Sequence, residues 1–204
     1  MRRARTSDTL SLVLSTNGAE LGKPPPVLET ARLALRPFRA NDIDGVFGYA
    51  ADEEVSRFVL WDRHESRDDS RRFLDWVLSQ YARGELPVWG IVRKETGRLV
   101  GSIGYGWHEP SHARAEVGYV LKRDCWGQGV MTEAVRAVLG HAFGTLKLHK
   151  VNAHCHVQNV GSRRVLEKVG MRHEGRLYEQ LFVKGSYWDI DVLGMVDREW
   201  KGAR

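Results

Sequence analysis

The most regular pattern in the chain is an amphipathic helix over residues 131–143. Apolar side chains recur there at intervals of three and four, the spacing that places them on one face of an α-helix. They are Met131, Ala134, Val135, Val138, Leu139, Ala142 and Phe143. Gly144 follows and predicts the end of the helix. A second helix is predicted over residues 66–81, ending before Gly84, with one face formed by Phe73, Trp76, Val77 and Tyr81.

Shorter segments with strand patterns lie around these helices. Leu33 and Leu35 alternate with more polar residues up to Pro37, which predicts a strand. Two strands over residues 87–93 and 98–107 are predicted to form a hairpin, because a turn sequence with Gly97 separates them. Further strands are predicted at 113–121, 148–157, 177–183 and 186–196, with a short helix at 161–169. Strands and helices in this order predict an α+β or α/β sheet domain.

The first 27 residues do not share this periodicity. They run into three prolines at positions 24–26, which predicts a flexible extension over residues 1–27 ahead of a single domain over residues 28–204. The whole chain of 204 residues is long enough to bury a sizeable core. No apolar run approaches the roughly 20 residues that span a bilayer, so no membrane association is expected.

Composition narrows the compartment and the partners. The two cysteines, Cys125 and Cys155, exclude a disulfide-stapled scaffold and favour a reducing, cytoplasmic location. Lys and Arg number 31 against 26 acidic residues, a net charge of +5 that is spread along the chain. Because the basic residues do not interleave with an aromatic platform, a nucleic-acid partner is not expected. The charge suits an anionic small ligand without identifying one.

A glycine turn links a predicted strand to the strongest helix. Gly127 and Gly129 lie where the helix begins, and a helix N-terminus offers unpaired N–H groups and a partial positive charge. Glycines let phosphates approach such a backbone closely, which predicts a pyrophosphate site. An alternative is that the glycines only permit a tight turn. A Walker loop is excluded because no Lys-Ser or Lys-Thr follows, and a dinucleotide motif lacks its third glycine at Thr132.

Several segments in this order together resemble a known family. The segments are 30–37, 116–121, 126–134, 159–171 and 174–176. They are similar to the GNAT superfamily of N-acetyltransferases, and more narrowly to its branch of RimJ/RimL-type ribosomal-protein acetyltransferases. The resemblance runs from about residue 28 to residue 200. It implies an α+β fold with a mixed, mostly antiparallel central sheet that is flanked by helices and splayed at the acetyl-CoA site.

The resemblance also implies which residues bind acetyl-CoA. Backbone amides of the turn and of the first helical residues hold the pyrophosphate, and Thr132 adds its hydroxyl. The cofactor-binding residues of this segment are Trp126, Gly127, Gln128, Gly129, Val130, Met131 and Thr132. Val120 and Leu121 pair with the pantetheine arm through their backbones, and Asn159 contacts the pantetheine amide. Asp124 stands where the family usually has Gln or Arg, and Arg123 is expected to offset its charge.

Two residues are candidates for the chemistry. Glu116 matches a position that takes the proton of the amine in related enzymes, and Gly118 beside it predicts a bulge or a close ligand approach. The alternative for Glu116 is an exposed strand residue paired with Arg114 or with a neighbouring strand. Ser162 is the candidate acid toward the CoA thiolate, because the tyrosine that many relatives use is replaced by Leu166. The alternative for Ser162 is a helix-capping serine, and the same alternative holds for Asn159.

Other reactive residues carry less weight. His154 and His156 would share one strand face, but two ligands without a third do not make a metal site, so no metal is expected. Direct attack by the amine needs no covalent intermediate on Cys125.

The sequence therefore predicts an acetyl-CoA-dependent N-acetyltransferase that works through a ternary complex. The acceptor suggested by the resemblance is a protein N-terminal α-amine, such as that of a ribosomal protein. The alternatives are a small amine of the polyamine or aminoglycoside type, and a non-catalytic acyl-CoA-binding module. The sequence also leaves a homodimer open.

Overall fold

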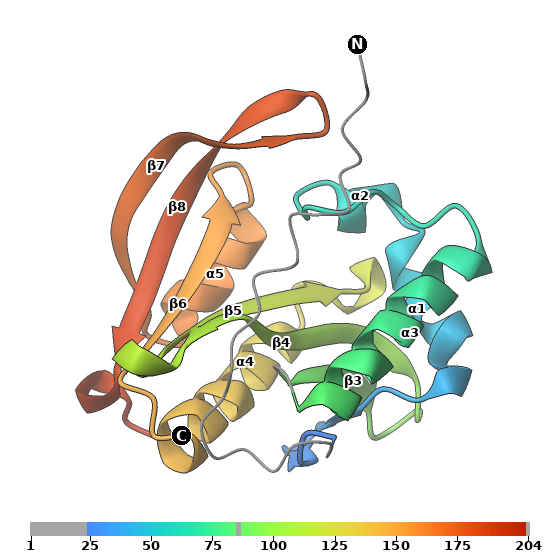
Figure 1. Cartoon of the computed structure of the whole chain (residues 1–204), viewed down its shortest axis with the longest axis horizontal. Coiled ribbons are helices and arrows are strands. Elements are labelled where there is room, and N and C mark those ends of the chain that lie inside the picture. The colour runs from blue at the N-terminus through green and yellow to red at the C-terminus, as the bar shows by residue number, and fades with distance from the viewer. Residues whose placement is uncertain (1–23, 85–86, 203–204) are drawn as a thin grey trace.

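The computed structural model describes residues 24–84 and 87–202. Most of the predicted extension over residues 1–27 lies outside this part of the chain, so the division into extension and domain stays a prediction. The described strands form one eight-stranded sheet in the order β1-β2-β3-β4-β5-β6-β8-β7 (Figure 1). The strands are β1 (Leu28–Glu29), β2 (Leu33–Pro37), β3 (Val88–Arg93), β4 (Leu99–Glu109), β5 (Arg114–Leu121), β6 (Lys150–His156), β7 (Arg172–Val183) and β8 (Ser186–Val196). The α-helices are α1 (Ile43–Ala50), α2 (Glu53–Ser56), α3 (Arg67–Arg83), α4 (Val130–Gly140) and α5 (Val160–Lys168).

One neighbouring pair in the sheet differs from the rest. β5 and β6 run parallel, whereas all other neighbouring strands of the described sheet are antiparallel. A parallel pair needs a crossover connection, and α4 supplies it between β5 and β6. The structure therefore confirms the mixed, mostly antiparallel sheet.

The sheet splits between β5 and β6. Their register covers Arg114 to Glu116 opposite Lys150 to Asn152, and beyond these residues the two strands diverge (Figure 1). β4 carries an extra residue between Tyr105 and Trp107, opposite the step from Glu116 to Val117. A bulge increases the local bend of a strand, so β4 and its neighbour β5 bend where the pairing of β5 with β6 ends. The bulge beside Glu116 was predicted at Gly118, but it lies in the neighbouring strand.

Helices cover both faces of the sheet. The larger core cluster joins α4 and α5 to alternate residues of the central strands, including Ala115, Val117, Ala153 and Cys155. The smaller cluster joins α1 and α3 to the opposite face, where Val120 packs against it. Since side chains alternate along a strand, Glu116 and His154 lie on the α1/α3 face and Tyr119 on the α4/α5 face.

The two strongest helices form where the sequence predicts them. The predicted apolar face of α4 is buried, although the chain continues after Gly140 through a π turn, His141–Thr145. α3 starts at a capping box between Ser66 and Asp69 and ends at Gly84, whose φ of 65° is left-handed. The prediction for Trp76 is wrong: its side chain is 40% exposed, because the buried face of α3 turns through Leu74 and Val77 instead.

A long hairpin forms one edge of the sheet. β7 and β8 meet across Lys184 and Gly185, as predicted, but β7 begins at Arg172, before the predicted start at residue 177. Two irregularities interrupt its register with β8, and such interruptions remove the alternation from which the strand was predicted.

Candidate active site

Two hydrogen-bonded pairs of side chains lie on opposite faces of β5 at the split. Glu116 Oε2 is 2.9 Å from His154 Nδ1 on the α1/α3 face. Tyr119 Oη is 3.0 Å from Ser162 Oγ on the α4/α5 face. Each pair therefore connects β5 to an element on the far side of the gap: β6 in the first case and α5 in the second.

The pair of Glu116 and His154 is accessible to solvent. The side chain of Glu116 is 28% exposed and that of His154 is 40% exposed. The hydrogen bond from the imidazole to the carboxylate raises the pKa of His154 above its ordinary value, because the carboxylate stabilises the charged ring. Of the alternative partners predicted for Glu116, Arg114 pairs with Glu109, whereas a neighbouring strand, β6, does supply the partner. The sequence did not identify His154 as that partner, because the alignment of β6 with β5 depends on the crossover between them.

The pair of Tyr119 and Ser162 is less accessible. Burial raises the pKa of the Tyr119 hydroxyl well above its ordinary value, which keeps the phenol neutral. Tyr119 also lies 3.2 Å from the backbone oxygen of Ser162. Leu166, at the position where relatives have a tyrosine, is fully buried in the core. A tyrosine hydroxyl thus reaches Ser162 from β5 rather than from the helix.

The first turn of α5 is capped as the alternative for Asn159 predicts. Asn159 Oδ1 accepts a hydrogen bond of 3.0 Å from the Ser162 backbone N–H. This bond uses the side-chain oxygen of Asn159 and does not involve its amide nitrogen. Capping and a contact with a pantetheine amide are therefore compatible.

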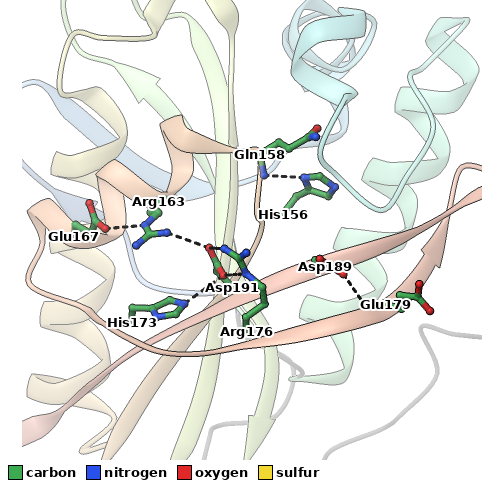
Figure 2. Close-up of polar contacts among 9 residues, drawn as sticks. All are labelled: His156, Gln158, Arg163, Glu167, His173, Arg176, Glu179, Asp189 and Asp191. Atoms are coloured by element: carbon green, nitrogen blue, oxygen red, sulfur yellow. Dashed lines mark hydrogen bonds and ion pairs between the residues drawn. The ribbon is translucent and has the colours of Figure 1, made fainter.

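A buried carboxylate fixes the same helix to the β7–β8 hairpin. Asp191 is fully buried and contacts three basic side chains, Arg163, His173 and Arg176 (Figure 2). Arg176 approaches to 2.8 Å and lowers the pKa of Asp191 most, with His173 adding to the effect. Arg163 follows Ser162 directly and lies 3.3 Å from Asp191, so this cluster determines how the start of α5 sits beside β5.

The glycine turn forms an open N-terminus for α4. Gly127 and Gly129 have φ angles of 73° and 75°, in the left-handed region that glycine adopts without strain. Space lies open beside Gly127, where an added Cβ would meet nothing within 4 Å. Val130 and Met131 bury their side chains in the core and therefore offer only backbone groups to a ligand. A helix N-terminus of this kind can bind an anion through its backbone N–H groups.

Several side-chain hydrogen bonds hold this turn in place. Gln128 accepts hydrogen bonds from Arg32 at its backbone oxygen (3.0 Å) and from Arg93 at its side-chain oxygen (3.2 Å). Its amide nitrogen donates to the Asp124 backbone oxygen. The Trp126 indole N–H donates to the Leu121 oxygen at 2.8 Å. Arg32, which precedes β2, and Arg93, at the end of β3, were missed in the sequence because they are distant from the turn in the chain. Each also pairs with a carboxylate, Arg32 with Glu133 at 2.7 Å and Arg93 with Glu95 at 3.5 Å.

Asp124 is neutralised locally. Its carboxylate lies 2.8 Å from Lys122 Nζ, which lowers the pKa of Asp124 and holds it as a carboxylate. The prediction that Arg123 offsets this charge is wrong, because Arg123 pairs with Asp52 at 3.0 Å.

The open edge of β5 has a defined backbone direction. The Lys122 N–H donates to the Val100 oxygen of the preceding β3–β4 hairpin, so alternate residues, including Val120, direct their backbone groups toward β4. Leu121 and Tyr119 direct theirs toward the gap. Of the two residues predicted to pair with a pantetheine arm, Leu121 directs its N–H toward the gap while its oxygen accepts from Trp126, and Val120 directs its backbone groups toward β4.

A cleft of about 880 Å³ opens on the opposite side of the sheet from the α4 N-terminus, between α2 with its following loop and the tip of the β7–β8 hairpin. It is lined by Glu53, Glu54, Ser56, Arg57, Asp62, Arg63, Glu65, Asp69 and Lys184. Lys184 donates to the Ser56 backbone oxygen and so links the hairpin to α2. Phe58 stacks on His156 with ring centroids 4.9 Å apart, which connects this loop to β6.

Among residues 24–84 and 87–202, no group of three or more His, Cys, Asp or Glu side chains is arranged to hold a metal ion. No helix in the same part of the chain has the length and apolar character to cross a membrane.

Residues 32–172 match the family model described as "Acetyltransferase (GNAT) domain". Among curated proteins, the chain is 30% identical to the uncharacterized N-acetyltransferase YoaA of Bacillus subtilis over 84% of this chain and 97% of that protein. It is 26% identical to the ribosomal-protein-serine acetyltransferase of Escherichia coli over 65% of this chain and 73% of that protein. It is 22% identical to spermidine N(1)-acetyltransferase of Vibrio cholerae over 83% of this chain and 96% of that protein.

A solved structure agrees with this result. The structure of a GNAT-family acetyltransferase from Bacillus anthracis superimposes with a TM-score of 0.77 at 26% identity, covering 85% of this chain and all of that one. The ribosomal-protein relative supports the RimJ/RimL-like branch. With its split sheet, its open α4 N-terminus and these matches, the chain belongs to the GNAT family of N-acetyltransferases.

Proposed function

We propose that this protein transfers the acetyl group of acetyl-CoA to a primary amine by direct attack in a ternary complex. The observation that carries the proposal is the short pairing of β5 with β6, which ends at Glu116 and leaves the edge of β5 open along the residues that lead to the N-terminus of α4. A diphosphate held at that N-terminus would lead a pantetheine arm along the open edge of β5. The thioester would then lie between the two hydrogen-bonded pairs.

Each part of the site has a role in this proposal. The amides of Gly127, Gln128, Gly129, Val130, Met131 and Thr132 hold the diphosphate, with Trp126 bracing the turn. Leu121 pairs with the pantetheine arm, and Asn159 contacts its amide. Glu116 lies where the amine loses its proton, and Ser162 donates a hydrogen bond to the departing thiolate.

The acceptor that we favour is a protein N-terminal α-amine. The similarity to the ribosomal-protein-serine acetyltransferase supports this choice. The cleft beside the β7–β8 hairpin is lined by residues of α2 and its loop, and its volume of about 880 Å³ is within the range of ligand pockets.

A small cationic amine is the second candidate. Five of the charged residues that line the cleft are acidic and three are basic, which favours a positively charged acceptor. The similarity to a spermidine acetyltransferase points in the same direction. A cytoplasmic location, predicted from the two cysteines, stays part of the proposal.

A turnover screen tests the proposal. The protein is incubated with acetyl-CoA and either peptides of different N-terminal residues or a set of amines including spermidine, and released thiol is measured. The proposal expects thiol release that depends on one class of acceptor. Tight binding of acetyl-CoA in calorimetry without turnover on any acceptor would instead indicate a non-catalytic acyl-CoA-binding module.

A further inference from the structure

We propose that His154 is a catalytic residue of the acetyl transfer, whose Nε2 atom takes the proton of the acceptor ammonium while Glu116 acts as its positioning residue. This inference rests on the proposed function, since it names the proton-accepting atom of the same site. It changes the role of Glu116 from the base itself to the group that orients the base.

The geometry of the pair carries the inference. Glu116 Oε2 lies 2.9 Å from Nδ1 of the ring. A carboxylate at Nδ1 holds the ring proton on that nitrogen and leaves Nε2 as the acceptor of a further proton. Among residues 24–84 and 87–202, Glu116 is the one side chain that hydrogen-bonds the His154 ring, so Nε2 is available to a substrate.

The location of the pair brings Nε2 to the gap. Asn152 is the last residue of β6 in register with β5, and His154 lies on the stretch of β6 that borders the split. Its side chain, 40% exposed, lies on the face away from the α4 N-terminus. A donor that enters from the α4 side would therefore present its carbonyl to an amine held next to His154.

The proton transfer balances without a further reactant. His154 Nε2 takes one proton from the ammonium, and the amine nitrogen then bonds to the thioester carbonyl carbon. The C–S bond breaks, and the second N–H proton passes through a hydroxyl or water to the thiolate sulfur. The exposed imidazolium returns its proton to solvent. An imidazole is better matched than a carboxylate to this task near neutral pH, because its pKa is closer to the operating pH.

Glu116 is the main charged group near the His154 ring, so the pH dependence of activity can report on this pair. Glu116 faces the ring from β5, and apolar Val192 lies opposite it on β8. The other charged or titratable groups on this side are His156, Lys150 and Glu174, with Arg57 and Asp189 near His156. Lys150 and Glu174 neutralise each other at 2.7 Å. Glu116 is thus the main charge acting on His154.

The competing interpretation is that the pair only fastens β5 to β6. The two interpretations differ in the variants His154→Gln and Glu116→Gln. A matched control is His149→Gln, which removes a second histidine–carboxylate pair, with Asp197 at 3.5 Å, just before β6. The measurement is kcat/KM against pH with the N-terminal seryl peptide or spermidine, whichever the wild type acetylates, alongside the Kd for CoA. Ionisation of the amine itself is common to all variants and cancels.

We expect His154→Gln to lower kcat/KM about 10²–10⁴-fold with an unchanged Kd for CoA. In Glu116→Gln, the acid limb of the residual activity should move to lower pH, because the ring has lost the carboxylate that raises its pKa. His149→Gln should change neither. Wild-type kcat/KM with an unmoved acid limb in His154→Gln would overturn the inference.

A second measurement covers a variant that does not fold. The His154 ring is titrated by NMR in the wild type and in Glu116→Gln, and an imidazole pKa that does not fall on loss of the carboxylate overturns the inference. Failure of the proposed function is separate, since it is seen in the wild type alone as absence of acetyl transfer to every amine in the screen.

Discussion

The two faces of β5 at the split carry hydrogen-bonded pairs of opposite character. Glu116 and His154 are partly exposed and combine a carboxylate with an imidazole whose pKa is raised. Tyr119 and Ser162 are partly buried neutral hydroxyls, and burial raises the pKa of Tyr119. The first pair can exchange a proton near neutral pH, whereas the second can only direct a hydrogen bond. The two faces of one strand are thus suited to the two ends of an acyl transfer.

The largest expected effect comes from the exposed pair. Glu116→Gln should lower kcat/KM for the amine by about 10²–10⁴-fold, because it removes the carboxylate on which proton removal depends. The Kd for CoA should stay within error, since the turn at Gly127 is untouched. Steady-state kinetics and calorimetry on the same preparation check both values. Full activity of this variant across the pH range would remove the exposed pair from the mechanism.

Asp191 supports the buried pair through α5 and should give the next largest effect. Asp191→Asn should lower the free energy of unfolding by about 3 kcal/mol, the low end for a broken buried ion pair because its three partners remain partly hydrated. Because the pKa of Asp191 is lowered in the folded state, its carboxylate contributes fully to the free energy of unfolding above the ordinary Asp pKa of about 3.9. This contribution is lost as the pH falls through the folded-state pKa. Urea unfolding at several pH values should therefore show a flatter acid region in the variant than in the wild type.

The glycine turn lies between the two pairs in expected effect. Gly127→Ala and Gly129→Ala should weaken CoA binding by about 5- to 30-fold, as expected from the 1–2 kcal/mol that a left-handed conformation costs other residues. Gly97→Ala is the matched control, with a φ of 66° and no atom within 4 Å of the added Cβ, but in the β3–β4 turn. Calorimetry with CoA should separate the variants, and an equal loss of affinity in the control would show that the effect is general destabilisation.

The buried pair should give the smallest effect. Ser162→Ala and Tyr119→Phe should each lower kcat by about 3- to 10-fold, the value of one hydrogen bond, and the double variant should lose less than the product of the two. Both should keep the acid limb of the pH profile, because neither removes the imidazole. A loss as large as that of Glu116→Gln, or a displaced limb, would show that the buried pair also carries a proton.

Local patterns predicted the parts of the site that depend on local geometry. The glycine turn and α4 follow from residues next to one another in the chain, and both appear as predicted. Alternation along β5 correctly placed Glu116 and Tyr119 on opposite faces. That Tyr119 meets Ser162, 43 residues away, depends on how α5 packs, and the sequence contains no local signal for it.

Long-range register explains the remaining misses. His154 pairs with Glu116 only because the crossover through α4 returns the chain to β5 in one alignment. The direction of the Val120 backbone likewise depends on its register with β4. Trp76 was placed in the core from a helical face that is narrower in the structure than in the pattern.

The brevity of the β5–β6 pairing bears on the order in which the two substrates bind. With three register pairs holding these strands together, β5 and β6 diverge beyond Glu116 and Asn152. A pantetheine arm paired along β5 would fill part of the gap between them and add contacts for the amine, so the amine should bind more tightly once the donor is in place. Linkage is reciprocal, so a bound acceptor should slow donor escape by strengthening its affinity, committing the complex to reaction.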